Sequence, residues 1–105
     1  MHIISRKRLL EFVASHGDAE AALDTWYRIA KVAEWKNLVE LREAYPAADL
    51  VDIYTVFNIK GNHYRLIGEV NYRSGTIFVR DILTHADYNK DKGRIEFYGF
   101  LKIIL

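Results

Sequence analysis

Residues 53–83 read IYTVFNIKGNHYRLIGEVNYRSGTIFVRDIL and begin with side chains that alternate between two faces. One face holds Ile53, Thr55, Phe57 and Ile59, and the other holds Tyr54, Val56, Asn58 and Lys60. A period of two is the spacing of a β-strand. Residues 60–63, Lys-Gly-Asn-His, predict a turn in which Gly and Asn supply positive φ, and residues 73–76 predict a second turn. The segment therefore predicts three strands, at residues 53–59, 64–72 and 77–83, joined as an antiparallel meander.

Outward from this meander, toward the N-terminus, the apolar spacing becomes helical. Leu9, Phe12 and Val13 stand at i, i+3 and i+4, after Ser5 as a candidate N-cap and before Gly17 as a helix end. A second helix is predicted over roughly residues 19–34, with Asp18 as its N-cap. Its apolar stripe consists of Ala19, Ala22, Leu23, Trp26, Ala30 and Ala33.

Three shorter segments complete the pattern. Residues 38–41 predict a short helix that stops before Pro46, residues 47–52 a connector, and residues 1–4 a short strand. Helices followed by a meander predict an α+β fold, with two or three N-terminal helices packed on a small antiparallel β-sheet. Because 105 residues have room for one hydrophobic core, we expect a single domain over residues 1–105.

The composition is that of an ordinary globular protein. The chain has no Cys, its N-terminus does not resemble a signal peptide, and no run approaches the ~18 apolar residues of a membrane span. We therefore expect a cytoplasmic protein with no membrane partner. The net charge is +1, but residues 1–53 carry −2 and residues 54–94 carry +3. This asymmetry weakly favours a phosphate-facing surface in the second half.

The motifs of many enzyme classes are absent from the sequence. It has no Gly-rich phosphate loop, no His-Glu-x-x-His and no Gly-x-Ser-x-Gly. The histidines are widely separated, at His2, His16, His63 and His85. A metal site therefore has no local support in the sequence.

The strand-rich half gathers cations, amides, tyrosines and two histidines. Cations neutralise phosphate and aromatic rings stack on unpaired bases, so this composition suits RNA. It also suits metal-free RNA cleavage, in which imidazole transfers protons and arginine stabilises developing negative charge. The candidate residues are Lys60, Asn62, His63, Arg65, Arg80, His85, Tyr88 and Lys90.

Each of the main candidates also has a purely structural interpretation. His85 follows a strand and could begin a turn, and Tyr88 could be a half-buried packing residue. The two strand arginines could be solvated or paired with acidic neighbours, Glu69 and Asp81. From the residues alone, the chain is an α+β domain for which RNA binding is a hypothesis.

Two sequence blocks carry a resemblance to a known family. Residues 56–66 read Val-Phe-Asn-Ile-Lys-Gly-Asn-His-Tyr-Arg-Leu, and residues 84–88 read Thr-His-Ala-Asp-Tyr. Together with Phe78-Val79-Arg80 between them and Ala44-Tyr45-Pro46 before them, they resemble the HigB family of type II toxins, within the RelE-like superfamily. The resemblance covers roughly residues 1–92.

The resemblance implies a toxin that cleaves mRNA, typically in the ribosomal A site, without a metal or cofactor. It implies a HigA-like antitoxin with a helix-turn-helix domain, and contact with operator DNA only through the toxin–antitoxin complex. Carried over by position, His85, Tyr88, Arg80 and Arg65 are the catalytic candidates. Lys60, Asn62, His63 and Lys90 are the candidates for RNA contact.

The C-terminus departs from the family pattern. Residues 95–105, IEFYGFLKIIL, form an apolar tail where family members commonly stop. Two other functions stay open at this point. One is a non-catalytic interaction protein, such as a ParE-like gyrase inhibitor, and the other is an RNA-binding module without turnover.

Overall fold

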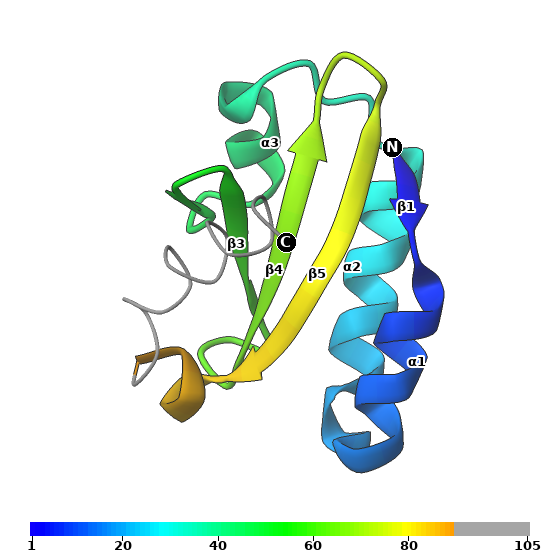
Figure 1. Ribbon diagram of the computed structural model, residues 1–105, viewed down its shortest axis with the longest axis vertical. Coiled ribbons are helices and arrows are strands. Elements are labelled where there is room, and N and C mark those ends of the chain that lie inside the picture. The colour runs from blue at the N-terminus through cyan, green and yellow to red at the C-terminus, as the bar shows by residue number, and fades with distance from the viewer. Residues whose placement is uncertain (90–105) are drawn as a thin grey trace, which may run out of the picture.

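The computed structural model describes residues 1–89, so Lys90 and the apolar tail lie outside the described residues. Figure 1 shows the helices first and the meander after them. The elements in chain order are β1 (His2–Ile4), α1 (Arg6–Ser15), a 3-10 turn η1 (Gly17–Ala19), α2 (Glu20–Val32), α3 (Leu38–Ala44), β2 (Asp49–Val51), β3 (Tyr54–Ile59), β4 (Tyr64–Asn71) and β5 (Thr76–Thr84). Residues 85–89 are helical. The predicted α+β class, three helices and meander are confirmed.

The sheet is mixed and has the order β1-β5-β4-β3-β2. Strands β2 to β5 pair antiparallel, whereas β1 runs parallel to β5, with His2 opposite Thr76. The predicted sheet was antiparallel throughout, so this parallel edge strand was not anticipated. The predicted connector at residues 47–52 also contains a strand, β2, which pairs with β3 across a tight turn at residues 52 and 53.

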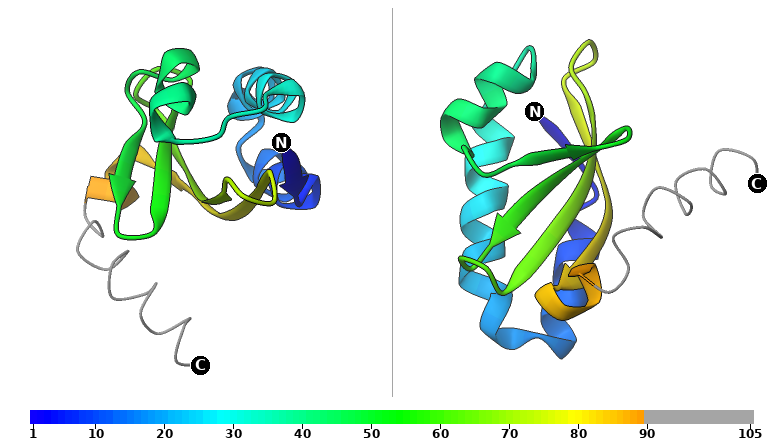
Figure 2. Two further views of the ribbon diagram at one scale, coloured as in Figure 1. Left: turned by 90° about the horizontal axis from the view of Figure 1, so that it is seen from above. Right: turned by 90° about the vertical axis from the view of Figure 1, so that its left-hand side faces the viewer.

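The helices pack on one face of the sheet, and the main core lies between them (Figure 2). Trp26 of α2 and Leu41 of α3 bury their side chains there. They meet Phe57 of β3, which is fully buried and makes edge contacts with the rings of Trp26 and Tyr45, each with centroids 5.4 Å apart. The predicted apolar stripe of the second helix therefore faces the core.

A second, smaller core covers the opposite face of the sheet. It consists of Val51, Tyr54, Val56, Ile67 and Tyr88, with Leu83 packed against it. Because Tyr88 belongs to the helical residues 85–89, this core fixes those residues against the face that the other helices leave open. We call this surface the open face.

Two local predictions were wrong. Asp18 is not the N-cap of α2, which is Ala19, because Asp18 lies inside the turn η1. In the first hairpin turn the residues with positive φ are Lys60 (53°) and Gly61 (61°), so Asn62 does not take the left-handed conformation. The side chain of Asp18 instead makes long-range contacts with Lys60 and Tyr64, and that of Asn62 contacts Arg65. Within residues 1–89 no helix has the length and apolar character needed to cross a bilayer.

Candidate active site

Strand alternation brings Arg65 to the open face. Its neighbours Tyr64 and Leu66 belong to the main core under the helices, so Arg65 between them points the other way. Arg65 is only 7% exposed. A cation can be buried this deeply only when its donors find acceptors, so its partners define the site.

Arg65 gathers three of the residues selected from the sequence. Its Nη1 donates to the backbone oxygen of Tyr64 at 3.1 Å, and its Nη2 donates to Asn62 Oδ1 at 2.5 Å. The same Nη2 lies 2.9 Å from His85 Nδ1. The guanidinium carbon also lies over the ring of Tyr88, 5.6 Å from its centroid. The structure thus brings Asn62, Arg65, His85 and Tyr88 together.

A helix start directs His85 and Tyr88 to the same place. The hydroxyl of Thr84 accepts the backbone N–H of Asp87 at 3.1 Å, which is the bond of a helix N-cap. His85 and Tyr88 are three residues apart on this turn, so they share a face. The backbone N–H of His85 donates to the oxygen of His63 at 2.8 Å and ties the turn to the first hairpin.

The environments of these two candidates differ. His85 is half-buried, and its Nε2 lies 2.9 Å from the side-chain amide nitrogen of Asn89. Tyr88 is 7% exposed, with its ring in the small core. The ring of Tyr88 is therefore a packing group of the smaller core, and it also lies against the guanidinium of Arg65. Asn89 was not selected from the sequence, although its position four residues after His85 is the signal that could have indicated it.

Arg80 lies on the same sheet but outside this cluster. Its Nη2 is 3.5 Å from Glu69 Oε2, and the guanidinium lies over the ring of Phe78. Arg65 pairs with Leu83, so Arg80 is three residues farther along β5, about 10 Å at a rise of 3.3 Å per residue. Of the two acidic neighbours that the sequence suggested, Glu69 is the partner of Arg80, whereas Asp81 accepts the backbone N–H of Ile82. Arg80 is thus paired with Glu69 and lies apart from the Arg65 cluster.

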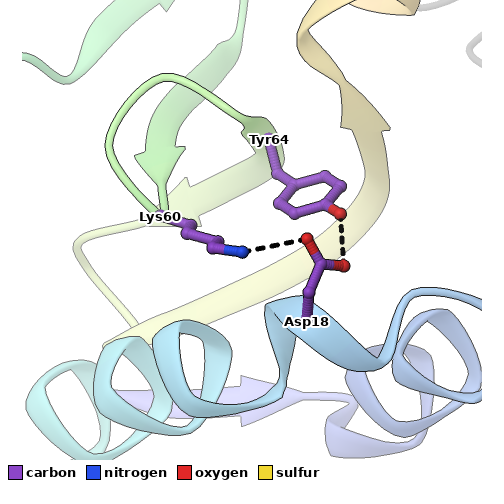
Figure 3. Close-up of polar contacts among 3 residues, drawn as sticks. All are labelled: Asp18, Lys60 and Tyr64. Carbon is purple, nitrogen blue, oxygen red and sulfur yellow. Dashed lines mark hydrogen bonds and ion pairs between the residues drawn. The ribbon is translucent and has the colours of Figure 1, made fainter.

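Lys60 lies on the helix side of the hairpin (Figure 3). Its Nζ is 3.0 Å from Asp18 Oδ2, and the hydroxyl of Tyr64 donates to Asp18 Oδ1 at 2.6 Å. The hydrogen bonds from Tyr64 and Lys60 lower the pKa of Asp18, and the bond to Asp18 raises the pKa of Tyr64. Asp18 therefore joins the turn before α2 to the hairpin that carries Asn62. Lys60 pairs with this carboxylate on the helix side of the hairpin, whereas the Arg65 cluster lies on the open face.

Replacing Asp18 by Asn is expected to flatten the acid limb of the stability profile. The pKa of Asp18 is lower in the folded protein than its ordinary 3.8. Its contribution is therefore complete above that value and is lost as the pH falls through the lowered pKa. Melting temperatures measured between about pH 6 and pH 3 should fall less steeply for Asp18→Asn than for the wild type. Glu20→Gln, an exposed neighbour, is the control. Parallel profiles for wild type and Asp18→Asn would contradict the expectation.

His63 is exposed, and its contribution to the cluster is the carbonyl that holds His85. Its ring centroid lies 6.4 Å from that of Tyr64. No group of three or more His, Asp or Glu side chains suited to a metal ion occurs within residues 1–89. Within the same residues, the polar groups gathered around Arg65 are its buried guanidinium, the imidazole of His85 and the side-chain amides of Asn62 and Asn89.

The fold and this cluster occur in a chain that matches a known toxin family. Residues 19–91 match the HigB toxin family, described as the RelE-like toxic component of a toxin–antitoxin system. The chain belongs to this family and is therefore the toxin of such a pair. The mRNA interferase HigB of Escherichia coli O6:H1 (strain CFT073) is 31% identical over 93 residues, covering 86% of this chain and 90% of that protein. The mRNA interferase toxin HigB of Escherichia coli K12 and the mRNA interferase HigB of Shigella flexneri are each 25% identical, covering 85% of this chain and 88% of those proteins.

Proposed function

We propose that this toxin is an endoribonuclease that cleaves mRNA at the open face of its sheet. The observation that carries the proposal is the contact between His85 Nδ1 and Arg65 Nη2, 2.9 Å apart, in a chain whose relatives are named mRNA interferases. An imidazole beside a guanidinium combines a group that handles protons with a group that stabilises a phosphate charge. A gyrase-binding role, the non-catalytic alternative, would need no such imidazole.

The reaction proposed is attack of a ribose 2′-oxygen on the adjacent phosphorus. The bond from the 2′-oxygen to phosphorus forms as the bond from phosphorus to the 5′-oxygen breaks. The 2′-hydroxyl gives up its proton, and the departing 5′-oxygen gains one. His85 and Tyr88 are the candidates for handling these protons, while Arg65 and Arg80 supply positive charge for the phosphorane-like transition state.

RNA contacts outside the reacting phosphate are assigned to the first hairpin. The exposed ring of His63 stands next to the cluster and can stack on an unpaired base. The side-chain amide of Asn62 and the ammonium group of Lys60 are the other proposed RNA contacts of this hairpin. The ammonium group lies on the far side of the turn and pairs with Asp18. Lys90 completes this proposed set from outside the described residues.

The remaining parts of the proposal are supported by the resemblance to the HigB family. The antitoxin is a HigA-like protein with a helix-turn-helix domain, and operator DNA is bound only through the toxin–antitoxin complex. Cleavage takes place in the cytoplasm, on mRNA in the ribosome, and requires no metal ion. The whole chain, residues 1–105, acts as one toxin domain.

Two linked measurements test this proposal. Primer extension on transcripts after induction of the toxin should reveal discrete new 5′ ends within coding regions. Purified toxin that has been treated with EDTA and then freed of the chelator should cleave mRNA in translating ribosomes at the same positions. Absence of discrete ends, with growth still arrested, would contradict the nuclease. Equal cleavage of naked mRNA would contradict the ribosome requirement alone, and loss of cleavage after the EDTA treatment would contradict metal independence.

A further inference from the structure

We infer that Asn62 is a positioning residue that acts through Arg65 to hold His85 as the neutral tautomer protonated on Nε2. His85 then meets RNA with a proton to donate at Nε2, and its lone pair at Nδ1 is occupied. This inference deepens the proposed function and rests on it for its catalytic meaning. The tautomer itself is a property of the free protein.

The argument begins with the hydrogens of Arg65. Its Nη2 carries two, and two acceptors lie within hydrogen-bond distance, Asn62 Oδ1 at 2.5 Å and His85 Nδ1 at 2.9 Å. A guanidinium has no acceptor and keeps its charge in proteins. A hydrogen on His85 Nδ1 would therefore point at a hydrogen of Arg65. The contact requires a bare Nδ1 that accepts, and a neutral imidazole with a bare Nδ1 carries its hydrogen on Nε2.

The other side of the ring accommodates this tautomer. The side-chain amide of Asn89 lies 2.9 Å from Nε2. A half turn of this amide exchanges its nitrogen and oxygen without changing its volume, and places Oδ1 where it accepts the Nε2 hydrogen. Asn89 lies on the exposed rim of the site, so RNA can take over the Nε2 hydrogen by displacing one amide.

Arg65 can impose the tautomer because it is itself held in place. It is 7% exposed, its Nη1 is fixed on the backbone oxygen of Tyr64, and the ring of Tyr88 lies beneath it. Asn62 fixes the remaining end, because its oxygen accepts one Nη2 hydrogen and directs the other toward His85. The positive φ of Lys60 and Gly61 turns the chain so that Asn62 can do this. An asparagine first selected as an RNA contact is therefore already committed to Arg65.

The tautomer decides whether Nε2 of His85 donates or accepts a hydrogen during catalysis. In this tautomer Nε2 stabilises negative charge on a phosphoryl oxygen by donating a hydrogen bond. The group that accepts the 2′-hydroxyl proton is then not Nε2 of His85. The two side-chain amides therefore have different roles. Asn62 sets the tautomer of His85, whereas Asn89 only occupies Nε2 until RNA binds there.

Nuclear magnetic resonance of full-length toxin labelled with ¹⁵N-histidine tests the inference without RNA. Two-bond ¹H–¹⁵N spectra of the neutral ring distinguish a protonated nitrogen from a bare one, and loss of signals in His85→Gln assigns the ring. We expect wild-type His85 to be protonated on Nε2 alone. Asn62→Ala should convert it to a mixture of tautomers, and Asn62→Asp, which keeps the oxygen acceptor, should restore the single form. Asn58→Ala, the asparagine paired with Arg65 on β3, is the matched control and should keep the wild-type spectrum.

The outcomes separate the two levels of the proposal. A wild-type ring protonated on Nδ1 would overturn the inference whatever the cleavage assay shows. An unchanged spectrum in Asn62→Ala would remove Asn62 as the positioning residue. Cleavage by Asn62→Ala is expected to fall by up to about 10²-fold, as misplacement of a reacting group does, with recovery in Asn62→Asp. A correct tautomer in a protein that cleaves no RNA would leave the inference standing and overturn the proposed function.

Discussion

His85→Ala is expected to lower the rate of mRNA cleavage by about 10²–10⁴-fold, the range for loss of a positioned proton-transfer group or of a donor that stabilises transition-state charge. The change removes the imidazole that Arg65 and Asn89 hold, while the backbone bond from residue 85 to the oxygen of His63 remains. Half-exposure of the ring lets water replace it, so the fold should survive. Primer extension and growth after induction measure the effect.

The control for this experiment is His2→Ala. His2 is exposed and pairs with Thr76, at the opposite end of β5 from His85. It should cleave mRNA and arrest growth as the wild type does. Full arrest by His85→Ala, with transcripts cut at the same positions, would remove this imidazole from the mechanism.

Phe57→Ala is expected to lower the free energy of unfolding by about 3–5 kcal/mol, the usual cost of emptying a fully buried phenylalanine site. The Phe57 side chain has no exposed surface and touches the rings of Trp26 and Tyr45. Since small domains are stable by about 5–15 kcal/mol, much of the total would be lost. Urea denaturation followed by tryptophan fluorescence measures the change.

Asn58→Ala serves as the matched comparison for Phe57→Ala. Asn58 is the next residue of β3, faces the other way and is exposed, so its replacement should change the free energy of unfolding by about 0.5 kcal/mol or less. Similar losses of the free energy of unfolding in the two variants would show that Phe57 and Asn58 do not differ in burial.

The local patterns of this chain predicted the elements because the forces that select them are local. Alternation placed Phe57 and Ile59 on the core face of β3, and the stripe through Trp26 placed α2 against them. Arg65 and His85 were selected by composition and by resemblance, and they do meet. The sequence around Arg65 does not show, however, that its guanidinium is buried and lies against the imidazole of His85.

The failed prediction for Asp18 concerns contacts between distant segments. Asp18 has the sequence context of a helix cap, and only the arrival of the first hairpin shows that it binds Lys60 and Tyr64. The pairing of Arg80 with Glu69, one of the two acidic neighbours that the sequence suggested, depends on the register of β4 against β5, which shifts at Ile67 and Gly68. Such contacts follow from tertiary register, which the spacing of residues along one strand does not encode.

The parallel seam between β1 and β5 has a consequence for biosynthesis. The first strand to leave the ribosome finds its only neighbour in the strand that ends the described sheet. Closing so long a loop comes late, because its entropy must be overcome before the contact stabilises anything. A nascent chain thus stays open at this edge until β5 and the following His85 turn have emerged. The contact between Arg65 and His85 likewise forms only after residue 85 has left the ribosome.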